Sequence, residues 1–194
     1  MQMPIVELTE DHQDRAFALL VAAFAADPFT RWFFGDPDDL QALFPVTLRH
    51  VGGSSFAHGG ALATDDIRGV ALWLPPGVAA DFEGMGAAFA EAGFEGPEEA
   101  QELFARMTQT HPHESHWYLP LIGVDPMARG RGFGSALMEA ALVRVDAEGL
   151  PAYLENTNPR NAPLYERFGF RMVSELQVGG SPVVQAMWRH AARG

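Results

Sequence analysis

A glycine-rich loop in the second half of the chain has the composition of an anion-binding site. Residues 129–134 read Arg-Gly-Arg-Gly-Phe-Gly and follow an apolar stretch that ends at Val124. The glycines leave one side of the loop without Cβ atoms, so backbone N–H groups can approach an anion closely. A helix starting at Gly132 adds the partial positive charge of its N-terminus. Because Arg129 and Arg131 add two full charges, we expect the loop to bind a pyrophosphate.

Two other interpretations of this loop are weaker. A plain strand-to-helix turn would not need three alternating glycines, which are costly in conformational entropy. A dinucleotide site is suggested by Gly130-x-Gly132-x-x-Ser135, with Glu155 near the place of a ribose-binding acid. The dinucleotide fingerprint begins directly after its strand, however, and here residues 125–129 intervene. The spacing therefore disfavours a nicotinamide cofactor.

A second motif follows the glycine loop later in the chain. Residues 161–170 read Asn-Ala-Pro-Leu-Tyr-Glu-Arg-Phe-Gly-Phe. This segment resembles the N…Y-x-x-x-G-F motif of the GNAT superfamily of N-acetyltransferases, and Arg129-x-x-Gly132-x-Gly134 matches that family's R/Q-x-x-G-x-G/A signature. The resemblance covers residues 116–176, and within the superfamily it is nearest to puromycin N-acetyltransferase and its relatives, through residues 116–119, 123–126, 153–155 and 159–161.

The resemblance implies an α/β fold with a mixed, mostly antiparallel sheet splayed between its fourth and fifth strands, and helices on both faces. It implies acetyl-CoA as the acyl donor, bound in the splay, and no metal. The residues implied to contact it are Leu121, Ile122, Val124, Arg129, Gly130, Arg131, Gly132, Phe133, Gly134, Ser135, Asn161 and Tyr165. Of these, residues 129–135 would hold the pyrophosphate, Asn161 the pantetheine, and Tyr165 would lie near the thioester sulfur.

Acetyl transfer to an amine needs a neutral amine and a stabilised leaving thiolate. Tyr165 is the expected general acid, because a phenol stays protonated at pH 7. For the base, two candidates stay open. Glu155, at the end of the fifth strand, is the better base chemically. Tyr118 lies on the fourth strand where several family members place a base, although a tyrosine would order a water chain instead.

The acceptor site is expected in the first half of the chain, where the family signature is weakest. The candidates for its wall are Trp32, Phe33, Phe34 and Trp73, with Trp32 the first among them, and His116 could face the same site. The histidines at 111, 113 and 116 resemble a metal cluster, but Pro112 and the lack of a matching partner favour a solvated loop.

The elements expected around these residues follow from periodicity and from proline and glycine breaks. Strands are expected at 5–8, 55–58, 61–64, 68–74, 116–124, 151–155, 170–177 and 183–188. Helices are expected at 11–26, capped by Asp11, and at 37–51, 80–92, 97–109, 132–146 and 161–168.

Composition indicates a single domain over residues 1–194, with its coenzyme-binding core at about 116–176. The net charge of −12 disfavours nucleic acid and anionic membranes as partners. The chain has no cysteine, so attack by the amine in a ternary complex needs no enzyme nucleophile. Without a visible signal peptide or membrane-spanning run, we expect a cytoplasmic monomer or homodimer.

The sequence therefore favours an enzyme that moves an acetyl group from acetyl-CoA to a primary amine of a small molecule. A non-catalytic acyl-CoA-binding module would keep the loop and lose the chemistry. O-acetylation needs the same fold and stays open, and an oxidoreductase of the dinucleotide type is the least favoured alternative.

Overall fold

The computed structural model describes residues 3–192, and its centre is a seven-stranded sheet in the order β1-β2-β3-β4-β5-β7-β6. The strands are β1 (Ile5–Glu7), β2 (Ala61–Thr64), β3 (Gly69–Leu74), β4 (Trp117–Val124), β5 (Ala152–Asn156), β6 (Arg171–Leu176) and β7 (Val184–Arg189). The α-helices are α1 (Gln13–Phe24), α2 (Pro28–Phe34), α3 (Pro37–Gly52), α4 (Ser54–Ala57), α5 (Phe82–Glu91), α6 (Ala100–Thr110), α7 (Phe133–Ala147) and α8 (Ala162–Arg167). Three 3-10 turns join them: η1 (Glu10–His12), η2 (Pro126–Ala128) and η3 (Pro159–Asn161).

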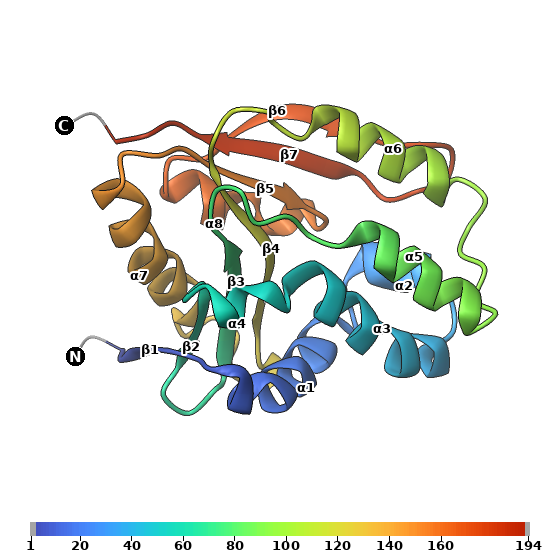
Figure 1. Cartoon of the computed structure of the whole chain (residues 1–194), viewed down its shortest axis with the longest axis horizontal. Coiled ribbons are helices and arrows are strands. Elements are labelled where there is room, and N and C mark those ends of the chain that lie inside the picture. Colours follow the sequence, from blue (N-terminus) through green and yellow to red (C-terminus); the bar gives the residue numbers. More distant parts are fainter. Residues whose placement is uncertain (1–2, 193–194) are drawn as a thin grey trace.

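The sheet opens in its middle. Neighbouring strands are antiparallel except for β4 and β5, which are parallel and pair only at Trp117–Ala152 and Tyr118–Tyr153. On its other side β4 stays paired with β3 as far as Val124. Figure 1 shows β5, β7 and β6 turning away from β3 and β4 beyond this point. The expected splay between the fourth and fifth strands is therefore confirmed, and it leaves one edge of β4 without a strand partner.

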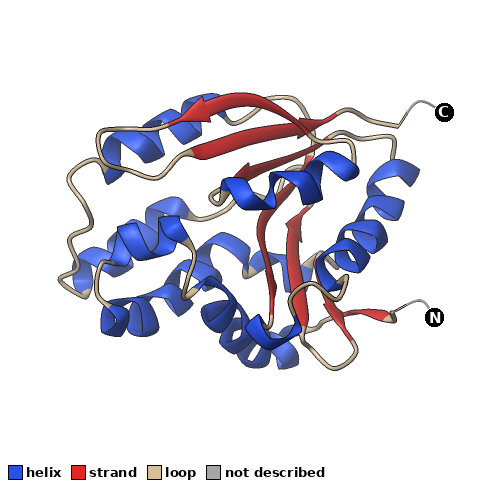
Figure 2. Ribbon diagram, turned by 180° about the vertical axis from the view of Figure 1, so that it is seen from behind, coloured by secondary structure: helices blue, strands red, loops and turns tan. Residues whose placement is uncertain are grey.

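Alternation along β3 divides the core between the two faces of the sheet. Val70 and Leu72 belong to a cluster with residues of α1, α2, α3 and α5, whereas Ala71 and Trp73 belong to a cluster with residues of α7 and α8. Figure 2 shows helices on both sides of the strands. The mixed α/β architecture expected from the sequence is confirmed.

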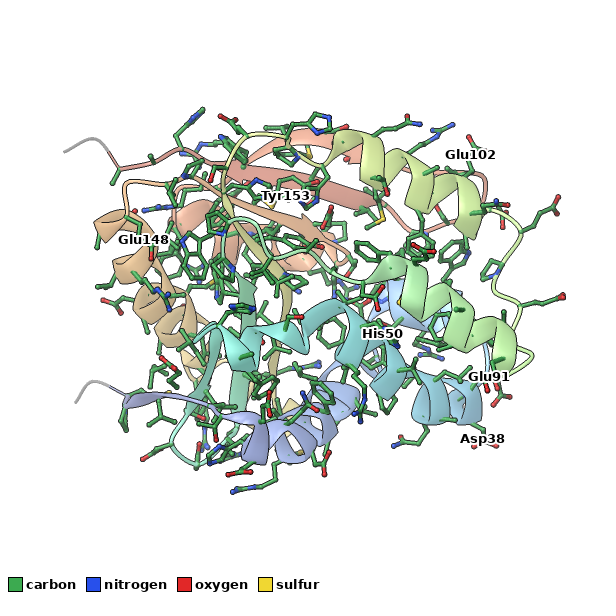
Figure 3. All side chains as sticks on the ribbon, viewed as in Figure 1. Asp38, His50, Glu91, Glu102, Glu148 and Tyr153 are labelled. Carbon is green, nitrogen blue, oxygen red and sulfur yellow. The ribbon has the colours of Figure 1, made fainter. Side chains whose placement is uncertain are left out.

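Aspartates begin the helices next to the opening. The Asp27 carboxylate caps α2 and that of Asp36 caps α3, each followed by a proline at the first helical position. Asp81 caps α5, and its Oδ2 lies 2.9 Å from Nδ1 of His50 on α3. Figure 3 shows His50 on α3 in the middle of the molecule. The contact between Asp81 and His50 joins α5 to α3.

Two sequence-based expectations are wrong. Residues 55–57 belong to the short helix α4 and His58 follows it in a turn, so no strand forms at 55–58. Gly53 adopts helical dihedral angles there, and the Ser55 hydroxyl donates to the Gly52 carbonyl at 2.6 Å. Asp11 does not cap the first helix. It lies inside the turn η1, which follows the extended residue Thr9, and α1 begins only at Gln13.

Among residues 3–192 no single helix has the length and apolarity to cross a bilayer. The pair Glu10–Phe24 and Pro28–Phe34 reaches that length only when joined across a bend of 94°.

Candidate functional site

Two cavities meet at the opening of the sheet. The first, the loop cleft, has a volume of about 700 Å³ and lies between the glycine loop, the end of β4 and α8. The second, the aromatic cavity, has a volume of about 140 Å³ and lies among α2, α3, α5, α6 and the strands β4 and β5. Residues that line both are Phe24, Asp27, Ile122, Asn161 and Tyr165. A ligand in one cavity can therefore contact a ligand in the other.

The glycine loop has the backbone geometry that its composition indicates. Gly130 and Gly132 have φ angles of 74° and 86°, a region that favours glycine, and a Cβ at either position would meet open space. Gly132 is followed directly by α7, so the first N–H groups of that helix face the cleft. Gly134 lies inside the helix, where a Cβ would come within 3.4 Å of Leu164. The loop thus combines free N–H groups with a helix N-terminus.

The arginines are distributed differently from the expectation. The Arg129 guanidinium lines the cleft, but it also donates to the Ala23 carbonyl at the end of α1 at 2.8 Å. Arg131 is exposed and does not line the cleft. Arg160 and Arg167, which the sequence analysis did not select, line it instead. Arg160 directly precedes Asn161, and Arg167 lies within the segment 161–170. Their closeness to Asn161 is the sequence signal that points to them.

The other residues expected at the donor site lie together. Those lining the loop cleft are Ile122, Val124, Gly130, Gly132, Phe133, Gly134, Ser135, Asn161 and Tyr165. Leu121 lines the aromatic cavity instead. The free edge of β4 beyond Tyr118 borders both cavities, so its unpaired backbone groups are available to a ligand.

Tyr165 lies at the junction of the cavities. Its side chain is buried, and its ring packs edge-on against Phe170 with the centroids 6.3 Å apart. Burial, and then the charge of Asp27, raise the pKa of the Tyr165 phenol. The phenol therefore keeps its hydrogen at neutral pH and can donate it to a ligand.

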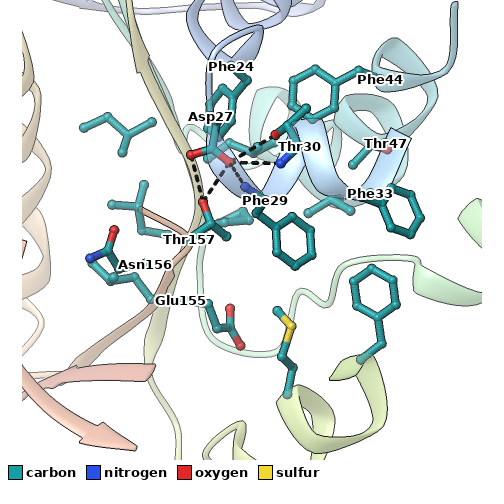
Figure 4. A pocket seen from close by; sticks show the side chains of 18 of the residues that line it. Phe24, Asp27, Phe29, Thr30, Phe33, Phe44, Thr47, Glu155, Asn156 and Thr157 are labelled. Atoms are coloured by element: carbon teal, nitrogen blue, oxygen red, sulfur yellow. Dashed lines mark hydrogen bonds between the residues drawn. The ribbon is translucent and has the colours of Figure 1, made fainter. Parts of the chain in front are cut away.

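Asp27 is the main residue that the sequence analysis missed at this junction. Its Oδ1 accepts from the backbone N–H groups of Phe29 and Thr30 at 3.0 and 3.1 Å, and the Thr157 hydroxyl donates to its Oδ2 at 3.3 Å. Figure 4 shows these bonds at the wall of the aromatic cavity. Burial raises the pKa of the Asp27 carboxyl, although its hydrogen bonds oppose that shift. The sequence signalled only a helix stop before Pro28.

Glu155 and Tyr118, the two candidate bases, are hydrogen-bonded to each other. The Tyr118 hydroxyl donates to Glu155 Oε2 at 2.6 Å, and both residues line the aromatic cavity. The Glu155 side chain is only 6% exposed, and its Oε1 lies 3.5 Å from Nδ1 of His111. Burial, and then the charge of Glu155, raise the pKa of the Tyr118 phenol well above its usual value. Tyr118 is therefore a donor, and Glu155 is the acceptor.

The aromatic cavity is built mainly by phenylalanines. Its apolar wall includes Phe24, Phe29, Phe33, Phe34, Phe44, Phe82 and Phe104, together with Met85 and Met107. In Figure 4, Phe33, Phe44 and Thr47 lie on one side of the view and Glu155 and Asn156 on the other. The cavity is therefore apolar at one end and carries carboxylates near its junction with the loop cleft.

Of the residues expected at the acceptor site, Phe33 and Phe34 line this cavity, whereas Trp32, Trp73 and His116 do not. Trp73 points to the opposite face of β3 and is 1% exposed in the cluster packed against α7. Trp32 packs against Phe29 and Phe33 from outside, with centroid distances of 5.5 and 6.5 Å. His116 lies behind Glu155, next to His111. Successive side chains of β3 point to opposite faces of the sheet, so Trp73 faces away from the side on which Leu72 and Leu74 lie.

Replacing Asp27 by asparagine should increase the free energy of unfolding at pH 7. Asparagine is an equally good helix cap, and it removes a buried charge. Because the folded-state pKa lies above the unfolded value, the folded protein binds this proton more tightly. The carboxylate therefore costs stability at neutral pH, and that cost falls as the pH drops through the raised pKa.

Urea unfolding of the wild-type protein and Asp27→Asn at pH 7 and at pH 5 measures this difference. The stabilisation should shrink at the lower pH. Asp36→Asn is the matched control, since Asp36 caps α3 in the same way but is exposed. A loss of stability in Asp27→Asn at pH 7 would show that the charge itself stabilises the fold.

Comparisons with known proteins agree with this geometry. The model of the acetyltransferase (GNAT) family matches residues 98–170. An uncharacterized N-acetyltransferase of Schizosaccharomyces pombe is 27% identical over 171 residues, which cover 80% of this chain and 69% of that protein. The mycothiol acetyltransferase of Propionibacterium freudenreichii is 39% identical over 77 residues, which cover 38% of this chain and 24% of that protein.

A solved structure extends the similarity to the whole chain. The protein described as histone acetyltransferase HPA2 and related acetyltransferase, from Corynebacterium glutamicum, has a TM-score of 0.71 at 28% identity and covers 100% of this chain, which in turn covers 99% of it. The splayed sheet with a glycine loop at its opening is the fold of an acyltransferase. By these matches, the chain is similar to acetyltransferases of the GNAT family. The nearer likeness to the puromycin N-acetyltransferase group stays a prediction.

Proposed function

We propose that the protein transfers the acetyl group of acetyl-CoA to a primary amine of a small molecule, by direct attack in a ternary complex. The observation that carries this proposal is the meeting of the loop cleft and the aromatic cavity at Tyr165 and Asp27. An acyl donor in the cleft and an amine in the cavity would have their reacting ends at this junction. This junction is formed by elements from both halves of the chain, which supports the prediction of a single domain.

Acetyl-CoA, the donor that the GNAT family uses, fits the loop cleft by size and by charge. The volume of about 700 Å³ is in the range of small-molecule sites. The N–H groups of residues 130–135 would bind the pyrophosphate, with Arg129, Arg160 and Arg167 adding positive charge in an otherwise acidic chain. The unpaired edge of β4 from Leu121 to Val124 and Asn161 would hold the pantetheine amides. Arg131 stays a candidate for the outer phosphates.

Tyr165 is proposed as the general acid. It would donate its phenol hydrogen to the sulfur as the carbon–sulfur bond breaks, which stabilises the thiolate that leaves. Its burial and its raised pKa support a donor role, because the phenol is held in its protonated form.

Glu155 is proposed as the base. A carboxylate accepts a proton at neutral pH, whereas the raised pKa of Tyr118 makes the phenolate inaccessible there. The Tyr118 hydroxyl would orient Glu155 through its 2.6 Å hydrogen bond. Glu155 would then take a proton from the bound ammonium group, which frees the nitrogen lone pair to attack the thioester carbonyl.

The acceptor is proposed to be an amine that carries one apolar group. A cavity of about 140 Å³ accommodates a single aromatic ring, and its walls are phenylalanine and methionine side chains. The carboxylates of Asp27 and Glu155 attract a cationic amine toward the junction. The buried Thr47 hydroxyl has no hydrogen-bond partner among residues 3–192, so it is available to a polar atom on the acceptor.

Release of free CoA from acetyl-CoA in the presence of a panel of amines tests the function. Phenethylamine-like amines should show kcat/KM values about 10- to 100-fold above those of short hydrophilic amines or polyamines, because burial of one ring is worth about 1.5–3 kcal/mol. Mass spectrometry of the product should place the acetyl group on nitrogen when an amino alcohol is offered.

Thermal unfolding with cofactors separates the alternatives. Stabilisation by acetyl-CoA without CoA release for any amine would favour a non-catalytic binding module. Transfer to the hydroxyl of the amino alcohol would favour O-acetylation. Stabilisation by NAD(H) or NADP(H) alone would overturn the proposed function.

A further inference from the structure

Two histidines lie outside both cavities, and one of them, His111, contacts the side of Glu155 that faces away from the aromatic cavity. His111 follows α6, and its Nδ1 lies 3.5 Å from Glu155 Oε1. Its ring also packs edge-on against Tyr118 and Tyr153, with centroid distances of 4.9 and 4.8 Å. Tyr153 lies on β5 and is buried, and Figure 3 labels its position. His111 therefore sits where a proton leaving Glu155 would emerge.

His116 fixes the hydrogen-bonding state of His111. Its Nδ1 lies 2.7 Å from the Glu114 carbonyl oxygen, and a carbonyl only accepts, so this nitrogen carries a hydrogen. Burial lowers the pKa of His116, which keeps the ring neutral and leaves a lone pair on Nε2. That Nε2 lies 3.2 Å from Nε2 of His111. His111 must then donate from Nε2, and its Nδ1 faces the carboxyl group of Glu155.

This arrangement has two states that differ in the position of one proton. In the first, Glu155 is protonated and donates to the lone pair of His111 Nδ1. In the second, Glu155 is a carboxylate beside a His111 imidazolium. The remaining titratable neighbours, Tyr118 and Tyr153, keep their protons because burial raises the pKa of both phenols. Glu155 and His111 are therefore the pair placed to exchange the proton of the acceptor.

The pair leads from the cavity to the surface. Glu155 and Tyr118 line the aromatic cavity, but neither His111 nor His116 does. The Glu155 side chain is 6% exposed, whereas the His111 side chain is 32% exposed. A proton moved from Glu155 to His111 thus passes from a closed position to one that water reaches.

We propose that His111 carries the acceptor's proton from Glu155 to solvent, and that His116 is a positioning residue that holds His111 in the required tautomer. The Oε1–H bond of Glu155 breaks as the Nδ1–H bond of His111 forms. The imidazolium then gives a proton to water or to a buffer base, which restores neutral His111 and the Glu155 carboxylate. This inference rests on the proposed role of Glu155 as the base.

The kinetic test compares His111→Gln with His113→Gln. His113 is an exposed histidine of the same loop and serves as the matched control. In dilute buffer, His111→Gln should lower kcat about 10-fold with the KM for acetyl-CoA unchanged. Added imidazole should restore most of that rate, and it should not affect His113→Gln. Equal kcat values for the two variants at every buffer concentration would overturn the relay while the transferase function stands.

A spectroscopic measurement tests the same inference without turnover. Nitrogen-15 NMR of the histidine rings, assigned with the two variants and His116→Gln, should show neutral His111 protonated at Nε2 and neutral His116 protonated at Nδ1. In His116→Gln the tautomer of His111 should become mixed. Protonation of neutral His111 at Nδ1 in the wild-type protein would overturn the relay. Inactivity of the wild-type protein with every amine would instead overturn the proposed function.

Discussion

Replacing Tyr165 by phenylalanine is expected to lower the rate of acetyl transfer about 100-fold, the size of effect found when a donor to a developing negative charge is removed. Phenylalanine keeps the ring that packs against Phe170, so the fold and the cleft should be preserved. The thiolate would then leave without a hydrogen-bond donor. The dissociation constant of acetyl-CoA is expected to stay unchanged.

The rate should be measured in a single turnover, because product release limits kcat in many enzymes. Thermal unfolding of the variant with and without acetyl-CoA provides the control for folding and binding. Unchanged transfer would remove Tyr165 from the mechanism. A large loss of acetyl-CoA binding would instead assign the tyrosine to the cleft wall.

Replacing Glu155 by glutamine should have an effect of similar or larger size. We expect kcat/KM at pH 7 to fall about 100- to 1000-fold, because the amide accepts the Tyr118 hydrogen bond but takes no proton. Only the neutral fraction of the amine can then react. With an amine pKa of about 10, that fraction rises tenfold per pH unit, so the deficit of the variant should shrink steadily toward alkaline pH.

Two further variants make this measurement specific. Glu166→Gln, on the exposed side of α8, is the matched control and should leave the profile unchanged. Tyr118→Phe should cost less than Glu155→Gln, because it removes only the group that orients the base. If Tyr118→Phe were the more damaging change and Glu155→Gln nearly silent, the roles of the two residues would have to be exchanged.

The half of the molecule around the loop cleft could be predicted because its signals are local. Glycines at positive φ, prolines at helix starts and an asparagine at a fixed distance from Tyr165 are readable within a short window. Even in this half, the sequence does not predict which way a long side chain points. Arg129 reaches the Ala23 carbonyl, 106 residues away in the sequence, and that contact follows from how α1 packs on the sheet.

The acceptor side could not be predicted because the residues that contact one another there lie far apart in the sequence. Asp27 and Thr157 lie 130 positions apart and meet only when α2 packs at the end of β5. Trp73 and Phe33 are both large aromatic residues near breaks, yet one packs under α7 and the other lines the cavity. The sequence predicts a solvated loop at His111, because nothing in it indicates that this loop packs against Glu155 as it does in the structure.

The two cavities are built from different parts of the chain. The loop cleft comes chiefly from β4, α7 and α8, within the stretch that matches the family model, whereas the apolar wall of the aromatic cavity comes largely from α2, α3 and α5, which precede that stretch. Mutations in these helices can reshape the acceptor's surroundings without touching the donor's. Selection for a new substrate could thus proceed by small steps, each of which leaves the acetyl-CoA site intact.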